Sequence, residues 1–180
     1  MRYDLLIQLA AQKKPNVLVE IGTHKGARAK LLKDHCEWYY GFDLWESGND
    51  EIDKAESNGK GRSSKEQAKE SLAGAYFQLW EGNTRETLPL FYKNKNGARM
   101  GLIDFAWIDG GHSVETIASD WHWISQMLAP GAVVVFDDYY EPEREGFGCN
   151  RIVAGIPHEL LAGDLIGGTT IRLVKYVHPA

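Results

Sequence analysis

The sequence has few cysteines, no excess of positive charge and no long apolar run. Its two cysteines, Cys36 and Cys149, stand far apart and outside any metal-binding spacing, so we expect two free thiols in a reducing cytoplasm. Acidic residues outnumber basic ones 25 to 20, for a net charge of −5. This balance argues against nucleic acid or a membrane as a partner, although it leaves a local basic patch open. Segment 1–15 is too short and polar to span a membrane and lacks the layout of a signal peptide. We therefore expect a soluble, cytoplasmic protein.

Internal repeats and low-complexity tracts are also absent, and 180 residues suit one domain over residues 1–180. Apolar runs alternate with segments of helical periodicity, which predicts an α/β fold with a doubly wound parallel sheet. The segment 46–64 is polar, charged and glycine-bearing, and we expect a mobile insert or a lid there. Strands are expected at 16–22, 38–45, 76–82, 102–109, 132–138 and 169–177, and helices at 5–11, 24–36, 65–75, 84–94, 113–129 and 150–162.

The loop after the first strand, "VEIGTHKG", places Glu20 at the strand end, followed by Gly22 and Gly26. Glycines let a backbone turn sharply and approach a ligand closely. A dinucleotide-binding loop would have the pattern G-x-G-x-x-G, which this loop lacks. An acid just before Gly22 repels a pyrophosphate but suits a ligand with an ammonium or sulfonium charge. Asp43 ends the second strand, where it is placed to accept hydrogen bonds from ribose hydroxyls.

Five segments, "VEIGTHKGARA", "GFDLW", "EGNTRETLP", "WIDGGHS" and "PGAVVVFDDY", together resemble the class I S-adenosylmethionine-dependent methyltransferases. The resemblance implies a Rossmann-like, mostly parallel sheet of seven strands. It also implies that the loop from Glu20 to Gly26, with Gly22 and Thr23, surrounds the methionine part of the cofactor. Asp43 would then hold the ribose, and Gly82-Asn83-Thr84 would lie beside the adenine. From the residues alone, the glycines fit an ordinary turn, Asp43 a surface acid, and Asn83 a helix cap.

Three carboxylates fall at the ends of two strands that are neighbours in the usual order of this fold. Asp109 ends the fourth strand, and Asp137 and Asp138 end the fifth. Neighbouring strands lie roughly 4.8 Å apart, so these carboxylates repel one another unless a cation lies among them. Oxygen donors with room for water and substrate suit Mg²⁺ or Mn²⁺. The sequence has no cluster of cysteine and histidine ligands that would suggest zinc.

The same arrangement resembles the metal-dependent O-methyltransferases, those of the macrocin and mycinamicin sugar-modifying type and, more distantly, the catechol type. This resemblance implies Mg²⁺ ligands at Asp109, Asp137 and Asp138. It implies a general base three residues beyond the first acid, at His112, with Asp109 serving both the cofactor and the reaction. Histidine is suited to accept a proton near neutral pH.

We therefore expect an O-methyltransferase that acts on a hydroxyl of a small molecule, such as a sugar or a vicinal diol. The residues leave other classes open: a metal-independent methyltransferase, an NAD(P)-dependent oxidoreductase, or a cofactor-binding partner without catalysis. His112 also fits the approach to a helix capped by Ser113. A homodimer is consistent with a short chain that has many aromatic residues.

Overall fold

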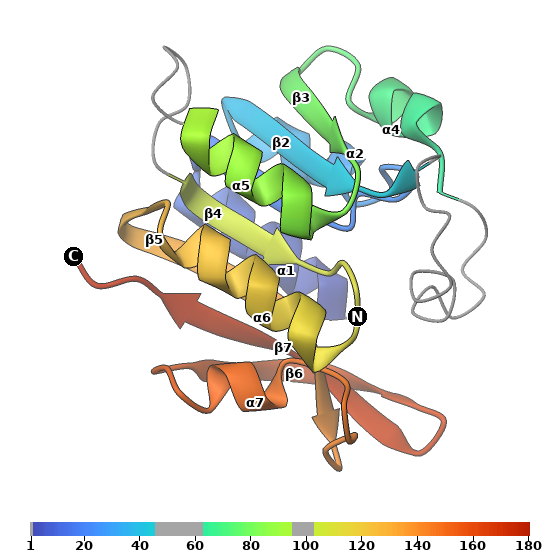
Figure 1. Ribbon diagram of the computed structural model, residues 1–180, viewed down its shortest axis with the longest axis vertical. Helices are drawn as coiled ribbons and strands as arrows, with labels where there is room; N and C mark the ends of the chain where they lie inside the picture. Colours follow the sequence, from blue (N-terminus) through green and yellow to red (C-terminus); the bar gives the residue numbers. More distant parts are fainter. Residues whose placement is uncertain (1, 46–62, 95–102) are drawn as a thin grey trace.

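The structure, a computed structural model, describes residues 2–45, 63–94 and 103–180. Seven strands form one sheet in the order β3-β2-β1-β4-β5-β7-β6 (Figure 1). The first five strands run parallel, whereas β7 pairs antiparallel with both β5 and β6. The strands are β1 (Val17–Ile21), β2 (Trp38–Asp43), β3 (Tyr76–Glu81), β4 (Ile103–Ile108), β5 (Leu128–Glu141), β6 (Glu159–Ile166) and β7 (Thr169–Val177). The Rossmann-like, mostly parallel sheet of seven strands predicted from the family resemblance is confirmed.

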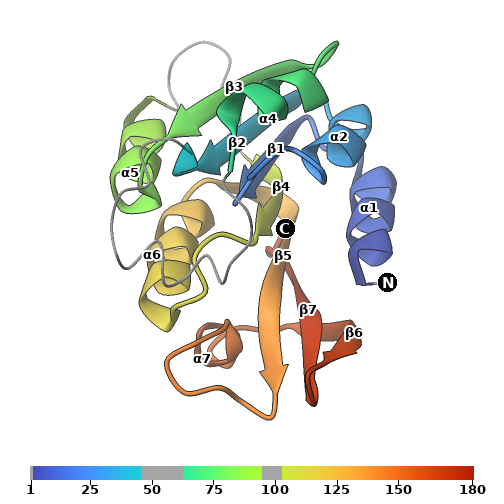
Figure 2. The same ribbon diagram turned by 90° about the vertical axis from the view of Figure 1, so that its right-hand side faces the viewer.

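Helices cover both faces of the sheet, because alternate residues of the buried strands point to opposite sides. Figure 2 shows α1 and α2 on one side and α5 and α6 on the other. The helical segments are α1 (Arg2–Lys13), α2 (Ala29–Leu32), the 3₁₀ turn η1 (Lys33–His35), α4 (Lys65–Ser71), α5 (Thr84–Asn94), α6 (Val114–Ser125) and α7 (Asn150–Val153). Among the described residues, none of these helices is both long and apolar enough to cross a membrane.

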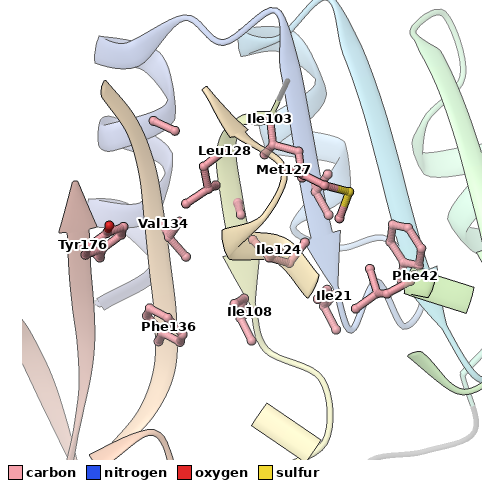
Figure 3. Close-up of a cluster of buried hydrophobic side chains, with 14 of the residues drawn as sticks. Ile21, Phe42, Ile103, Ile108, Ile124, Met127, Leu128, Val134, Phe136 and Tyr176 are labelled. Atoms are coloured by element: carbon pink, nitrogen blue, oxygen red, sulfur yellow. The ribbon is translucent and has the colours of Figure 1, made fainter. Parts of the chain in front are cut away.

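Each face has its own apolar cluster. Leu6 of α1 and Leu32 of α2 pack with Leu18 and Trp107 on one face. On the other face, α5 and α6 pack over a second cluster (Figure 3), whose strand residues include Ile21, Phe42, Ile108, Val134 and Phe136. Because these five strands run parallel, their carboxyl ends lie along a common edge of the sheet.

The carboxyl-terminal part of the chain differs from the expected helix at 150–162. Only Asn150–Val153 is helical, and Glu159–Ile166 forms the edge strand β6, antiparallel to β7. Pro157 interrupts the helix, since proline lacks the backbone N–H and clashes with the preceding turn. The residues that follow gain hydrogen bonds by pairing with β7 instead.

Several further boundaries also differ from the sequence prediction. The segment 24–36 begins as a turn, because Gly26 has φ +79°, and α2 starts only at Ala29. The helix expected at 113–129 ends at Ser125, and β5 runs from Leu128 to Glu141, beyond both ends of the predicted strand. The predicted insert at 46–64 lies outside the described residues, apart from its last two.

Candidate active site

The loop after β1 packs tightly against the loop after β4. Gly22 has φ +91°, and a Cβ atom there would lie 2.0 Å from the carbonyl oxygen of Asp109. The Asp109 N–H donates to the Ile21 carbonyl at 2.9 Å, and the Gly22 N–H donates to the Phe42 carbonyl at 2.9 Å. Only glycine fits this position, because any side chain would push the β1 and β4 loops apart. Gly22 therefore joins the ends of three strands.

Gly26 and Thr23 are needed in the same loop for packing. A Cβ atom at Gly26 would lie 2.7 Å from the Ser71 side chain, so this glycine allows α4 to approach the loop. Thr23 is buried at 3% exposure beside Gly41, whose missing Cβ leaves room for the threonine hydroxyl. These contacts are within the protein, and the cofactor contacts of Gly22, Thr23 and Gly26 stay predictions.

Glu20 is a fully buried acid beneath this loop, exposed by 1%. It accepts a hydrogen bond from the Tyr39 hydroxyl. Burial raises the pKa of the Glu20 carboxyl to about 7, opposed by the Tyr39 hydrogen bond and by the charge of Arg28, while Asp43 adds a smaller upward shift. Glu20 therefore changes its charge within the physiological pH range.

Replacing Glu20 with glutamine is expected to change how stability depends on pH. The native state holds a proton on Glu20 between pH 4.5 and about 7 that the unfolded chain releases, so stability falls as pH rises through this window. Glutamine stays neutral, and Glu20→Gln should be more stable than the parent at pH 8, by up to about 3 kcal/mol, and similar to it at pH 4.5. Urea unfolding at both pH values measures this. The exposed Glu86→Gln is the control, and a pH-independent difference for Glu20→Gln would contradict the assignment.

Asp43 connects the end of β2 to the loop after β1. One of its oxygens accepts the His24 N–H at 2.7 Å and the other accepts the Trp45 N–H at 3.0 Å. The Trp45 indole N–H in turn donates to the His24 carbonyl at 2.7 Å. Since a carboxylate oxygen has two lone pairs, these contacts orient Asp43 and leave acceptor capacity for hydroxyl groups.

Asn83 acts as a helix cap. Its side-chain oxygen accepts the Arg85 N–H at 3.0 Å, at the first turn of α5. This confirms the capping role anticipated for an asparagine at this position. The predicted contact of Asn83 with an adenine stays a prediction.

The ends of β4 and β5 bring Asp109, His112 and Asp138 together. One ligand atom from each of the three lies within 4.8 Å of the others, and the three residues are 7–9% exposed. Nε2 of His112 lies 3.4 Å from Oδ2 of Asp138, so this nitrogen faces the carboxylates. Ser113 caps α6 by accepting the Thr116 N–H at 3.2 Å. Ser113 therefore fixes the start of α6, as the alternative interpretation of His112 required, and His112 also lies beside Asp109 and Asp138.

Arg28 provides a cation for this group. Its Nη2 lies 2.7 Å from Oδ2 of Asp109. The guanidinium is stacked over the ring of Tyr3, 4.1 Å from the ring centroid. The buried carboxylate of Asp109 therefore already has a positively charged partner within the chain.

Asp137 lies apart from the other two acids, although the sequence placed all three in one metal site. Nε of Arg2 lies 3.1 Å from its Oδ1. Oδ2 accepts hydrogen bonds from Nη2 of Arg2 at 3.2 Å and from the Tyr3 hydroxyl at 2.9 Å. Burial, with the charges of Asp137 and then Asp109, raises the pKa of that hydroxyl, which therefore stays a donor. Successive residues of a strand point to opposite faces, which directs Asp137 towards α1.

The described donors fit a divalent cation in part. Asp109, His112 and Asp138 can offer two carboxylate oxygens and one imidazole nitrogen, whereas both oxygens of Asp137 face Arg2 and Tyr3. Carboxylate oxygens suit Mg²⁺ and Mn²⁺, whereas an imidazole nitrogen suits transition metals such as Zn²⁺ and Fe²⁺.

Sequence reasoning missed the three side chains that pair with the acids. Arg2 and Tyr3 precede the helix predicted at 5–11, and Arg28 belongs to the helix predicted at 24–36. A usable signal existed, because buried carboxylates at adjacent strand ends require cations. The sequence did not indicate which of its twenty basic residues would supply them.

A family model described as a methyltransferase domain matches residues 19–139. Among solved structures, the O-methyltransferase TomG from Streptomyces achromogenes, solved with S-adenosylmethionine, is 19% identical, with a TM-score of 0.69 and coverage of 98% of this chain and 79% of that one. An O-methyltransferase from Bacillus cereus, solved with S-adenosylhomocysteine, is 15% identical, with a TM-score of 0.66 and coverage of 97% and 80%. An rRNA methylase from Streptococcus thermophilus is 14% identical, with a TM-score of 0.70 and coverage of 100% and 98%.

At these identities the structural likeness shows the fold alone, and the acceptors named for these proteins differ. No curated protein sequence matches the chain. The family model, however, covers about two thirds of the chain, including the ends of β1, β2, β3 and β4 and most of β5. On this match, the chain belongs to the methyltransferase-domain family, and its fold is that of the class I S-adenosylmethionine-dependent methyltransferases.

Proposed function

We propose that this methyltransferase acts on a hydroxyl group of a small molecule and uses His112 as its general base. The observation that carries the proposal is the 3.4 Å approach of His112 Nε2 to Asp138 Oδ2. This pair lies in the buried group at the ends of β4 and β5, and the backbone of Asp109 in that group packs against Gly22 of the loop after β1. S-adenosylmethionine supplies a methyl group bound to a positively charged sulfur.

The chemistry requires a base, because an alcohol oxygen is a weak nucleophile until its proton leaves. As the new O–C bond forms and the S–C bond breaks, the hydroxyl proton passes to the imidazole of His112, and S-adenosylhomocysteine leaves. Asp138 stabilises the imidazolium that results. A positioned general base of this kind typically accelerates a reaction by about 10²–10⁴-fold. Alignment of the hydroxyl with the methyl group accelerates the reaction further.

We further propose that a divalent cation, Mg²⁺ or Mn²⁺, assists the reaction through Asp109 and Asp138. Such an ion lowers the pKa of a hydroxyl bound to it and orients the acceptor. An acceptor with two adjacent oxygens, such as a sugar or a vicinal diol, suits this arrangement. In this arrangement His112 accepts the proton and does not bind the ion.

A metal-independent methyltransferase is the second candidate, and the two arginines favour it. Arg28 lies 2.7 Å from Asp109, and Arg2 lies 3.1 Å from Asp137. Because these cations already balance two of the three acids, the site needs less added charge than the sequence alone implies.

Chelation separates the two candidates. After treatment with EDTA, methyl transfer to a panel of diols and sugars should fall by roughly tenfold or more and return with Mg²⁺ or Mn²⁺. The dissociation constant of S-adenosylhomocysteine, measured by calorimetry, should stay the same. Full activity under chelation would support the metal-independent candidate. Transfer to no hydroxyl acceptor, despite binding of S-adenosylhomocysteine, would contradict the proposed function.

A further inference from the structure

The first turn of α1 touches the site at two places. Arg2 and Tyr3 hold Asp137 through three contacts of 2.9–3.2 Å. The guanidinium of Arg28 lies over the ring of Tyr3, and Arg28 forms an ion pair with Asp109. Arg2 is only 7% exposed, and its Nη2 also donates to the Tyr3 hydroxyl at 2.9 Å. Arg2 and Tyr3 are therefore held in place by several contacts beside the site, unlike side chains that extend into solvent.

The end of β5 depends on these side chains, because its strand pairing is interrupted there. Pairing with β4 ends at Phe136, and pairing with β7 shifts its register between Phe136 and Tyr139. Asp137 and Asp138 lie in this interruption. Asp138 has φ +62°, a left-handed conformation that is uncommon for residues other than glycine and that the surroundings must hold in place.

A chain of contacts leads from Arg2 to His112. Oδ1 of Asp137, paired with Arg2, accepts the backbone N–H of Asp138 at 2.8 Å. The Asp138 carbonyl accepts the Cys149 N–H at 3.1 Å, and its carboxylate faces His112. If Asp137 turns away, Asp138 loses the hydrogen bond on its N–H, and one of the contacts that orient it towards His112 is lost, while the Tyr140 hydroxyl still bonds to its side chain.

We propose that Arg2 and Tyr3 are positioning residues for methyl transfer: through Asp137 they hold Asp138 against His112, and Tyr3 also orients Asp109 through Arg28. Asp137 is then an anchor for the end of β5, in place of the cation ligand predicted from the sequence. This inference rests on the proposed function of His112 and Asp138. It extends the active site to α1, which precedes the segment matched by the family model.

Two substitutions and one control test the inference. Arg2→Gln removes the guanidinium, and Tyr3→Phe removes the hydroxyl but keeps the ring beneath Arg28. The control is Lys13→Met, at the opposite end of α1, where Nζ donates to the Gly131 carbonyl at 3.0 Å. This control loosens α1 without touching Asp137, so it separates positioning from a general loss of helix docking.

We expect Arg2→Gln to lower kcat by roughly ten- to hundredfold, since small misplacements of reacting groups have effects of this size. The affinity for S-adenosylhomocysteine and the KM for S-adenosylmethionine should stay within about twofold of the parent values. Tyr3→Phe should have a smaller effect in the same direction, and Lys13→Met should keep kcat. In a further variant, Arg2→Gly, millimolar guanidinium should restore part of the activity. An unchanged kcat in Arg2→Gln, or an equal loss in Lys13→Met, would overturn the inference.

A crystal structure of Arg2→Gln provides a test that needs no turnover. We expect Asp138 to leave the left-handed region and its carboxylate to move away from His112. If the contact between His112 and Asp138 is unchanged, the inference is wrong, whether or not the protein methylates a hydroxyl. If the contact is lost but the parent protein transfers no methyl group to any hydroxyl acceptor, the proposed function fails and the positioning role of Arg2 stands.

Discussion

Replacing His112 with glutamine is expected to lower kcat by roughly two to four orders of magnitude, the usual contribution of a positioned general base. Glutamine keeps the polarity and approximate size of the side chain but cannot accept the hydroxyl proton. Because His112 does not need to touch the cofactor for this role, the affinity for S-adenosylhomocysteine should stay within about twofold. Steady-state kinetics with a diol or sugar acceptor, together with calorimetry, measure the two effects separately.

His122→Gln is the matched control, since it makes the same chemical change at an exposed position on α6, where the ring packs against Trp123. It should leave both kcat and cofactor affinity unchanged. A second comparison is Asp138→Asn, which removes the charge that stabilises the imidazolium and should lower kcat in the same direction. If His112→Gln keeps the kcat of the parent, His112 is not the base. The methyltransferase assignment, which rests on the family match and the fold, would remain.

Replacing Gly22 with alanine is expected to cause the largest loss of stability of any substitution considered. The new Cβ would lie 2.0 Å from the Asp109 carbonyl oxygen and 3.0 Å from the Gly110 Cα, and both neighbours are backbone atoms. The loops after β1 and β4 must separate to accept it. We expect about 3 kcal/mol or more of lost unfolding free energy, and S-adenosylhomocysteine binding too weak to measure.

Gly74→Ala separates the clash from backbone strain. Gly74 has φ +84°, close to the +91° of Gly22, but no described atom lies within 4 Å of the place its Cβ would take. Its replacement should cost about 1 kcal/mol, the typical penalty for a left-handed alanine. Urea unfolding of the two variants measures the difference. Equal losses would mean that the close approach of Gly22 to Asp109 contributes nothing beyond strain.

Much of the fold could be predicted from the sequence, because apolar periodicity and turn residues are local properties of the chain. The runs predicted as strands before Gly22, Asp43, Gly82 and Asp109 all form parallel strands in the structure. Prediction failed at 150–162, where alternating and helical patterns are hard to distinguish in a short segment after a proline. Pairing with β7 determined the conformation of residues 159–166, because among the described strands the edge strand β6 pairs only with β7.

For the site, the sequence by itself determined which residues lie at the carboxyl ends of the strands, and with them Asp109, His112, Asp137 and Asp138. The tertiary structure alone decided which of these residues meet. Asp138 faces His112, while Asp137 faces Arg2, which lies 135 positions away in the chain. The physical reason is that a local pattern fixes the place of a residue along a strand. The direction of its side chain, and the cation that compensates its charge, depend on the helices packed on each face and on the interrupted pairing at the end of β5.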